Sequence, residues 1–472
     1  MRFARRSALQ AMGLGAAVGA GTLGMPALAG RAVHAACRPA RGNPLLPGQG
    51  VCDPQVRVYG DTAYLYATHD ASPASSDFAM YDWQIWSSQD LVDWKLAGTL
   101  MPAQTYFGRA SSQCWATDAI HRDGLYYLYF SMGPRNIGVM VSDNPAGPWR
   151  DPLGKPLIAQ GDVPTRSRDP GILQEADGTS YIVFGTFDFY IARLNPDMVS
   201  LAETPRLLKI EEPQGPYGRG RTDDKPFLHR RGESYYLSWG SYYAIGDSPY
   251  GPFRCKGPLL LPENVDAEFL DDSAGTRLDP LNRPHDWLNF DRHGSFFEFR
   301  GQWYFACNDQ SQPGSSPFFR NSVISHVHYR ANGEIYPLRL TRTGVGRYDA
   351  QRGIRACDWF EASGACVEDR DGRPGAVFRS GGHACYPKIS ALAAETTMVG
   401  IMSRPFERSG TLEIRRSGPD GALLGSVGAG DGGIAQGAFR VRLSSLRETD
   451  DLCLVLRGGE DASLALEKFV FV

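Results

Sequence analysis

The sequence predicts an all-β protein, a five-bladed β-propeller followed by a β-sandwich of jelly-roll type. Three observations indicate this fold. One pattern, an apolar run, a Gly-containing turn and a Tyr-rich second run, recurs five times between residues 51 and 310. The turns are spaced by roughly 50 to 70 residues, a spacing typical of radial or stacked repeats. The 472 residues include 54 Gly and 32 Pro and show little helical periodicity, which is typical of all-β proteins.

Each repeat is predicted to be a β-hairpin, because β-branched and aromatic residues flank a Gly turn on both sides. The glycines of the five turns are Gly60, Gly124, Gly178, Gly232 and Gly301. The second runs cover residues 63–66, 126–129, 181–184, 235–237 and 303–305. Five hairpins with no helical pattern between them favour five propeller blades.

The propeller is expected to span residues 43–345. Residues 319–335 hold one more strand and a hairpin that would close the last blade, and Gly344-Val345-Gly346 marks a boundary. From residue 347 to 472 the pattern changes to short alternating strands, such as 411–415 and 439–443, separated by turns. Several short strands at close spacing predict a β-sandwich.

The first 36 residues are interpreted as a targeting segment. Arg5-Arg6 precede a mildly apolar stretch from Ala8 to Ala29, a pattern similar to a twin-arginine export signal. We therefore expect an exported protein, periplasmic or extracellular, without a membrane span. A membrane anchor and a lipoprotein modified at Cys37 are alternatives, although His34-Ala35-Ala36 is a poor lipobox.

The chain has nine cysteines and no Cys-x-x-Cys spacing, which argues against a zinc site. Export would permit disulfides, and the pairs Cys357–Cys366 and Cys385–Cys453 both remain open. The formal net charge is −3, and no basic stripe points to a nucleic-acid partner.

Polar residues recur just before the first strand of each repeat. In a propeller the innermost strands line a central channel, so residues at these positions should meet at one mouth of it. The five residues are Asp53, Trp115, Asp169, Asp224 and His293. The sequence thus predicts three carboxylates, one imidazole and one indole around a single site.

Several motifs resemble glycoside hydrolase family 43. They lie at residues 43–45, 53–54, 64–66, 87–94, 114–116, 168–171, 225–227, 235–238 and 293–295, in the order of that family. The resemblance covers about residues 43–345 and implies a five-bladed propeller. It also implies inverting removal of arabinofuranosyl or xylosyl units from plant-type polysaccharides or oligosaccharides.

The resemblance assigns roles to three carboxylates. Asp53 matches the general base, Asp169 matches the carboxylate that raises the pKa of the acid, and Asp224 stands where the family has a Glu as general acid. Inverting hydrolysis needs two carboxyl groups about 6.5 to 9.5 Å apart, so that water fits between them. Because Asp is shorter than Glu, two interpretations stay open: Asp224 or the adjacent Asp223 donates the proton, or the protein binds sugar without cleaving it. Asp223 is also open to a structural role, capping a blade or pairing with Lys225.

Further residues are candidates for substrate binding. Aromatic rings near predicted strand ends would stack on a sugar or fill space between blades, and they are Trp115, Phe187, Phe189, Tyr190, Tyr242 and Trp287. Arg292 and Arg320 would bond sugar hydroxyls or form salt bridges between blades. His293 matches a histidine at the channel floor that the family associates with calcium or water. A lone imidazole is a poor calcium ligand, so no cofactor is predicted and a structural calcium remains an alternative.

The C-terminal region, through residues 410–415 and 466–469, resembles a family 6 carbohydrate-binding module. Such modules stack an exposed Trp or Tyr on sugar, but Ile434 stands where a Trp is common, which leaves Tyr386 and Trp359 as candidates. A purely structural module is the alternative. For the whole chain, the leading hypothesis is an exo-acting glycosidase on α-L-arabinofuranosyl or β-D-xylosyl linkages. Its rivals are a non-catalytic sugar-binding propeller and a glycosidase for another furanoside such as galactofuranose.

Overall fold

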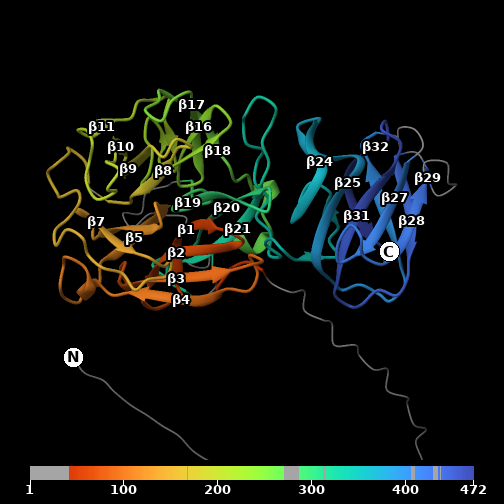
Figure 1. The fold of residues 1–472 in the computed structure, drawn as a ribbon, viewed down its shortest axis with the longest axis horizontal. Helices are drawn as coiled ribbons and strands as arrows, with labels where there is room; N and C mark the ends of the chain where they lie inside the picture. The colour runs from red at the N-terminus through yellow and green to blue at the C-terminus, as the bar shows by residue number, and fades with distance from the viewer. Residues whose placement is uncertain are drawn as a thin grey trace, which may run out of the picture. The chain divides into compact units, whose positions relative to one another are not determined.

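The structure is a computed structural model that describes residues 42–166, 168–270, 286–311, 315–404, 410–428, 434–435 and 437–472 (Figure 1). The expected export segment and Cys37 lie outside the described residues. Among the described residues, none of the helical segments has the length and apolar character needed to cross a membrane.

Five sheets within the described residues, antiparallel except for one short strand, form the blades of a β-propeller, as the sequence predicted (Figure 1). Blade 1 contains β1 (Val51–Tyr59), β2 (Thr62–Asp70), β3 (Met80–Ser88) and β4 (Lys95–Leu100). Blade 2 contains β5 (Cys114–Arg122), β6 (Leu125–Met132) and β7 (Asn136–Ser142). Blade 3 contains β8 (Gly171–Gln174), β9 (Ser180–Thr186), β10 (Asp188–Arg193) and β11 (Arg206–Leu207).

Blade 4 contains β15 (Phe227–Arg231), β16 (Ser234–Trp239), β17 (Tyr242–Gly246), β18 (Phe253–Pro258) and the short parallel strand β12 (Ile210–Glu211). Blade 5 contains β19 (Gly294–Phe299), β20 (Gln302–Asp309) and β21 (Asn321–Val327). A separate hairpin joins β13 (Gln214–Gly215) to β14 (Gly218–Arg219). Short 3₁₀ helices lie at η1 (Pro102–Gln104), η2 (Pro262–Asn264) and η3 (Ala267–Leu270).

The first strand of each blade belongs to a closed inner ring. Strand β1 contacts β5 and β19, β8 contacts β5 and β15, and β15 contacts β19. The ring is closed further by the segment before β1. Asn43 donates from Nδ2 to the carbonyl of Ile324 and accepts from its N–H, both at 2.8 Å, so its side-chain amide pairs with β21 as a backbone group would.

The five turns predicted from glycine have the expected conformation. Their glycines have φ values between 58° at Gly232 and 86° at Gly178, in the left-handed region that residues with a Cβ rarely adopt. Each turn links the inner strand of a blade to the second strand, so the inner strands all run in the same direction. Their starting residues therefore meet at one mouth of the channel, and their ends meet at the other.

The backbone is strained where three inner strands begin. Asp53, Asp169 and Lys225 each precede a proline and have φ values of 50°, 58° and 53°. Positive φ is uncommon for non-Gly residues, and such outliers concentrate at functional sites. The three residues are thus equivalent positions of blades 1, 3 and 4.

The C-terminal region forms a second β-structure with its own core. Its strands are β22 (Tyr348–Asp349), β23 (Ile354–Arg355), β24 (Glu361–Arg370), β25 (Arg373–Ser390), β26 (Thr396–Met402), β27 (Gly410–Arg416), β28 (Leu423–Gly428), β29 (Ile434–Ala435), β30 (Ala438–Leu443), β31 (Asp450–Gly458) and β32 (Ser463–Phe471). They form one nearly closed, sandwich-like sheet.

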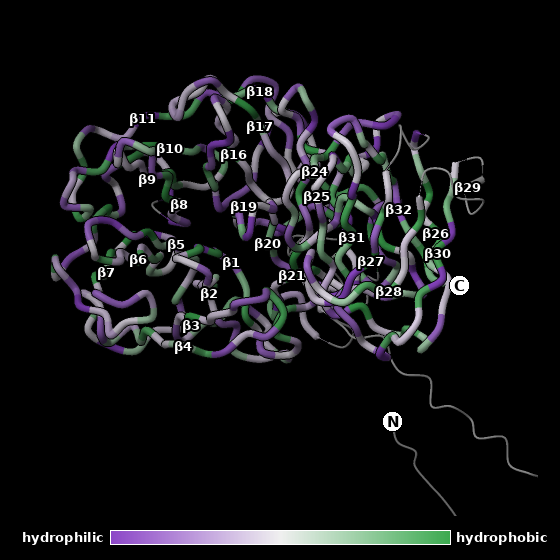
Figure 2. Tube along the Cα trace, turned by 45° about the vertical axis from the view of Figure 1, so that its right-hand side comes forward, coloured by the Kyte–Doolittle hydropathy of each residue, from purple (hydrophilic) through white to green (hydrophobic). Residues whose placement is uncertain are grey.

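Alternation along these strands builds the core. Every second residue points to the same face of a strand, and the buried leucines Leu412, Leu454, Leu456, Leu464 and Leu466 follow this spacing. Hydrophobic and hydrophilic stretches alternate accordingly along the trace (Figure 2).

Of the two disulfides that the sequence left open, the structure contains one. Cys385 and Cys453 are paired across strands β25 and β31, whereas Cys357 and Cys366 are both free.

Candidate active site

A cavity of about 190 Å³ opens at the channel mouth where the inner strands begin. Five carboxylates line it: Asp53, Asp169, Asp223, Asp224 and Asp291. They come from four segments of the chain and meet here because Asp53 lies at the start of inner strand β1 and the others lie two to four residues before inner strands β8, β15 and β19. Burial of so many carboxylates requires compensating cations or shared protons.

Asp53 is held as an anion. Its Oδ1 accepts hydrogen bonds from Arg320 Nη1 at 2.8 Å and Asn308 Nδ2 at 3.0 Å, and it lies 2.6 Å from His293 Nε2. Burial by itself would raise the pKa of Asp53, but Arg320, His293 and Asn308 together lower this pKa well below its ordinary value. A carboxylate that stays ionised beside a cavity can serve as a base.

Arg320 is fixed in turn by Asp70. Its Nε and Nη2 each donate to a carboxylate oxygen of Asp70 at 3.0 Å, and its backbone N–H donates to the same group. Arg320 and Asp70 are both nearly fully buried. The position of the cation beside Asp53 is thus set by a second carboxylate from the end of β2.

On the other side of the cavity, Arg168 joins two carboxylates. Its Nε lies 3.3 Å from Asp169 Oδ2, and its Nη2 donates to Asp224 Oδ2 at 3.0 Å. Burial raises the pKa of Asp169 to about 6, with Arg168 opposing the shift and Asp224 adding to it. Asp224 shows the opposite result: burial is outweighed by His293 and Arg168, which lower its pKa to about 2.

The imidazole of His293 lies between the two sides. Nε2 contacts Asp53, while Nδ1 lies 3.4 Å from Oδ1 of Asp224 and 3.4 Å from Oδ1 of Asp291. Burial disfavours its charged form, but these carboxylates raise the pKa of His293 well above its usual value. An imidazolium therefore separates Asp53 from Asp224 in this structure.

Asp223 differs from its neighbour Asp224. It is 5% exposed, and among the described residues its Oδ2 has no hydrogen-bond partner. Burial, with Asp224 and Asp291 nearby, raises the pKa of Asp223 well above its ordinary value. By contrast the Asp224 side chain is 26% exposed, more than those of Asp53 at 4% and Asp169 at 7%. Asp224 is therefore the acid candidate that a substrate reaches most easily.

Lys225 is a site residue that the sequence reasoning missed. It does not pair with Asp223. Its side chain is buried, and Nζ donates to the carbonyls of Thr117 at 2.9 Å and Pro170 at 3.4 Å. It ties blade 4 to blade 2 and to the segment that precedes blade 3, where Lys225 follows Asp224 and Pro170 follows Asp169 in the sequence. The signal was present in the sequence, since Asp53-Pro54, Asp169-Pro170 and Lys225-Pro226 share one repeat position.

The donor set at the channel floor is a poor match for calcium. Asp224, Asp291 and His293 offer ligand atoms close to one another. However, both carboxylates already contact guanidinium groups, Asp224 that of Arg168 and Asp291 that of Arg320 at 3.5 Å. Calcium takes six to eight oxygen ligands, and an imidazole is not among its preferred donors.

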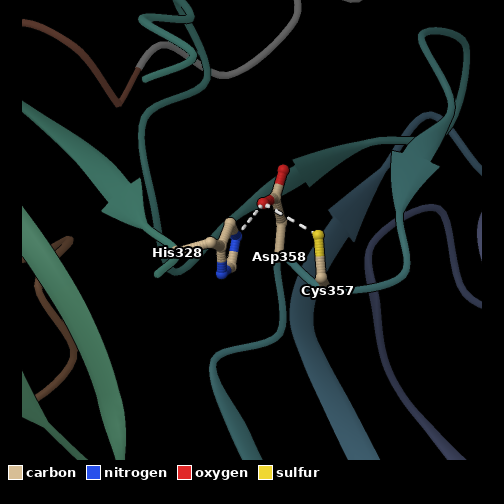
Figure 3. Close-up of side chains that lie close together, drawn as sticks. All are labelled: His328, Cys357 and Asp358. Atoms are coloured by element: carbon tan, nitrogen blue, oxygen red, sulfur yellow. Dashed lines mark hydrogen bonds and ion pairs between the residues drawn. The ribbon is translucent and has the colours of Figure 1, made fainter. Parts of the chain in front are cut away.

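A second group of metal-type ligands lies away from this cavity. His328, Cys357 and Asp358 approach one another, with His328 Nε2 2.9 Å from Asp358 Oδ1 (Figure 3). Both oxygens of Asp358 already accept hydrogen bonds from Arg355 at 2.8 Å. A paired arginine is a competing cation, so this group is an ion-pair network rather than a metal site.

The predicted substrate-binding residues divide into two groups. Trp115, His293 and Arg320 line the cavity. Phe189 and Tyr242 instead lie in the hydrophobic core shared by blades 3 and 4, and Tyr242 Oη donates to Asp286 Oδ2 at 2.7 Å. Arg292 points to the other side of its segment, where Nη1 donates to Asp309 Oδ1 at 2.9 Å. These three residues do not line the cavity.

Three aromatic residues, here called the aromatic wall, line the cavity together: Phe187, Tyr217 and Phe290. The Tyr217 ring lies 6.3 Å from that of Phe187 and 5.9 Å from that of Phe290, in edge-to-face contacts. Phe187 lies in the turn between β9 and β10 with a φ of 61°, and Tyr217 lies at the tip of the β13–β14 hairpin. Tyr217 and Phe290 were not predicted, because their loops show no repeat pattern.

The aromatic candidates of the C-terminal region are buried. Tyr386 is 0% exposed, and its Oη donates to the carbonyl of Ala356, while Trp359 is 5% exposed. Both rings belong to the core of that region, so neither offers a surface for stacking on sugar.

Pairs of carboxyl groups in one cavity are the groups that acid–base hydrolysis of a glycosidic bond uses. The model of glycosyl hydrolases family 43 matches residues 41–335. The chain belongs to this family and is a glycosidase.

Individual relatives are distant. A xylosidase/arabinosidase of Bacteroides ovatus is 27% identical over 341 residues, covering 62% of this chain and 95% of that protein. A β-D-galactofuranosidase of Aspergillus niger is 27% identical over 327 residues, covering 64% of this chain and 86% of that protein. Among solved structures, a family 43 arabinoxylan arabinofuranohydrolase from Bacillus subtilis in complex with cellotetraose has a TM-score of 0.51 at 19% identity. It covers 92% of this chain and 97% of its own, a likeness that concerns the fold alone.

Proposed function

We propose that the protein is an exported, inverting glycosidase that removes terminal α-L-arabinofuranosyl or β-D-xylosyl units from plant-type polysaccharides or oligosaccharides. The observation that carries the proposal is the opposition of two carboxylates across one cavity. Asp53 is held ionised by Arg320, and Asp224 is the more exposed carboxylate on the other side. The named activity of the Bacteroides ovatus relative supports the choice of sugars.

In the proposed mechanism Asp53 accepts a proton from a water molecule that attacks the anomeric carbon. The His293 ring lies between Asp53 and Asp224, with contacts of 2.6 Å and 3.4 Å on its two sides. We propose that the imidazole ring keeps the two carboxyl groups at the roughly 6.5 to 9.5 Å that inverting enzymes need. A retaining enzyme would need a shorter separation, of about 5 to 5.5 Å.

Asp224 is proposed to protonate the leaving oxygen. Because its pKa is low in the free enzyme, Asp224 must receive the proton from neighbouring carboxyl groups. Asp169, with a pKa raised to about 6, is the proposed reservoir, and Arg168 contacts both groups. A sugar that enters the cavity would exclude water, strengthen the repulsion between the carboxylates and so favour a proton on Asp224.

A panel of nitrophenyl glycosides tests the proposal, with NMR detection of the anomer first formed. We expect turnover of an arabinofuranoside or xyloside with inversion, and a loss of about a hundredfold or more in kcat for Asp53→Ala and for Asp224→Ala. Asp224→Ala should retain more activity on a dinitrophenyl glycoside, whose leaving group needs no acid. Asp223→Asn is the matched control, and if it alone shows this leaving-group pattern, Asp223 is the proton donor. Retention of configuration would contradict the mechanism.

A second substrate has one specific observation in its favour, the β-D-galactofuranosidase among the relatives. A nitrophenyl β-D-galactofuranoside therefore belongs in the same panel. A higher kcat/KM on it than on both pentosides would replace the proposed substrate and keep the roles of the carboxylates.

A further inference from the structure

Two arginines at the rim of the cavity make no ion pair with the residues that the structure describes. Arg166 lines the cavity and is exposed, and Arg221 is exposed beside the aromatic wall. Within the described part of the chain, neither guanidinium has a carboxylate within 4.0 Å. The two other arginines of the cavity, Arg168 and Arg320, are buried and contact carboxylates. The rim arginines are therefore not needed to neutralise the site.

Arg221 is held in place by aromatic rings. Its Cζ lies 4.0 Å from the centre of the Phe187 ring and 5.2 Å from that of Tyr217. A guanidinium that stacks on a ring uses its flat face, which leaves its N–H edge available for a ligand. The edge of a guanidinium matches a carboxylate with two parallel hydrogen bonds.

The aromatic wall and Arg221 together present one recognition surface. Phe187, Tyr217 and Phe290 line the cavity with apolar rings, against which a sugar ring in the cavity would pack. Arg221 adds a fixed positive charge beside these rings, and Arg166 adds a second charge at the same mouth. A sugar ring with a carboxylate, that is, a uronic acid, satisfies both features at once.

We propose that this rim binds a uronic acid residue on the leaving-group side of the scissile bond. The inference rests on the proposed function, because it places the pentosyl unit inside the cavity among the carboxylates. The polymer that carries that unit must then extend outward past the rim. The preferred substrate is accordingly a pentosyl unit attached to, or next to, an acidic sugar rather than to a neutral chain.

The test compares a pentosyl oligosaccharide that contains a uronic acid with its carboxyl-reduced, neutral counterpart. We expect wild-type kcat/KM to be about tenfold or more higher on the acidic substrate, and the preference to decrease at high salt, as exposed charges are screened. Arg221→Gln and Arg166→Gln should each lower the ratio several-fold, and the double variant should bring it close to one.

Arg109→Gln is the matched control. Arg109 is also exposed and also lies over an aromatic ring, with its Cζ 4.7 Å from the centre of Phe107, but it does not line the cavity. This variant should keep the wild-type ratio. Melting temperatures of all variants distinguish a lost subsite from a lost fold.

Calorimetry with the same two oligosaccharides separates this inference from the proposed function. Equal affinity and equal kcat/KM for the acidic and neutral forms would overturn the uronic acid subsite, while pentoside hydrolysis would still stand. Selective binding of the acidic form without hydrolysis of any pentoside would overturn the proposed function and keep the subsite. Loss of selectivity in Arg109→Gln as well would also overturn the assignment to Arg166 and Arg221.

Discussion

The two mouths of the propeller channel are built from the same five inner strands and differ in almost every chemical respect. The mouth where the inner strands start, here called the upper mouth, has a cavity of about 190 Å³. The mouth where they end, here called the lower mouth, has a larger cavity of about 440 Å³. At the lower mouth, Arg57 contacts Asp118, and Arg230 contacts Glu175 and the exposed Glu233, without a histidine shared among these carboxylates. The volume of the cavity therefore does not identify the active site, since the larger cavity lies at the lower mouth.

What distinguishes the upper mouth is that several buried carboxylates share the same cationic side chains. There, His293 contacts three carboxylates, and Arg168 and Arg320 contact at least two each. At the lower mouth the buried His229 stacks on Tyr236 and Phe296, and burial lowers its pKa to about 3, so that it stays neutral. Asp123 and Arg300, in the turns at the lower mouth, also have positive φ, so strained backbone alone does not identify the site. Several buried carboxylates that share His293, Arg168 and Arg320 do indicate chemistry, because a stable propeller does not need them.

Lys225 allows the sharpest test of this comparison. In Lys225→Met the cation below Asp169 is removed and two backbone carbonyls lose their donor. We expect kcat/KM to decrease by about tenfold to a hundredfold, because small displacements of catalytic groups are costly. Since Lys225 lowers the pKa of Asp169, the alkaline limb of the pH–rate profile should move to higher pH.

The pH profile separates the two roles of Lys225. A decrease in rate with an unchanged alkaline limb would mean that Lys225 only holds the blades together. Thermal unfolding of the variant supplies the control for a damaged fold.

The wild-type pH profile is expected to be bell-shaped with an acidic optimum. Asp169 has a raised pKa of about 6, so it holds its proton below that pH and loses it above. Hydrolysis should therefore decrease as the pH rises through about 6. Asp53 has a depressed pKa, so the acidic limb should lie below about pH 4, the ordinary range of an aspartate. Measurement of kcat/KM from pH 3 to 9 checks both limbs, and an optimum above pH 8 would contradict the proton reservoir.

Substitution at the lower mouth should have the smallest effect. Glu298 is exposed and lines the larger cavity. We expect Glu298→Gln to keep kcat/KM within about twofold and to leave both limbs of the pH profile in place, because exposed charges contribute little. A large loss of activity in this variant would show that the two mouths are coupled.

The propeller could be predicted from the sequence because each repeat is a short local pattern of residues. A glycine turn and an alternating hairpin need only a few neighbouring residues, so Gly60 and Gly232 could be assigned without knowledge of the rest of the chain. The same repeat placed Asp53 and Asp169 at one mouth, since equivalent positions in a closed ring must meet. The same repeat would also have predicted that Lys225 lies at this mouth, because Lys225 precedes a proline at the position that Asp53 and Asp169 occupy in their repeats.

Other parts of the site were decided only by tertiary structure. Phe187 and Phe189 are two residues apart, yet the first lines the cavity and the second packs in the core beside Trp239. The positive φ of Phe187 and the position of the β9–β10 turn make this difference, and neither can be read from residue type. Arg292 and Arg320 also looked equivalent, but only Arg320 contacts Asp53.

Protonation is the clearest case of a property that no local pattern contains. Asp223 and Asp224 are adjacent and chemically identical in sequence, but burial raises the pKa of the first and two cations lower that of the second. Those cations, Arg168 and His293, come from other blades. The sequence by itself determined which residues lie at the mouth, because repeats set position. The folded structure determined the charge each residue carries, because charge depends on neighbours that only the closed ring brings together.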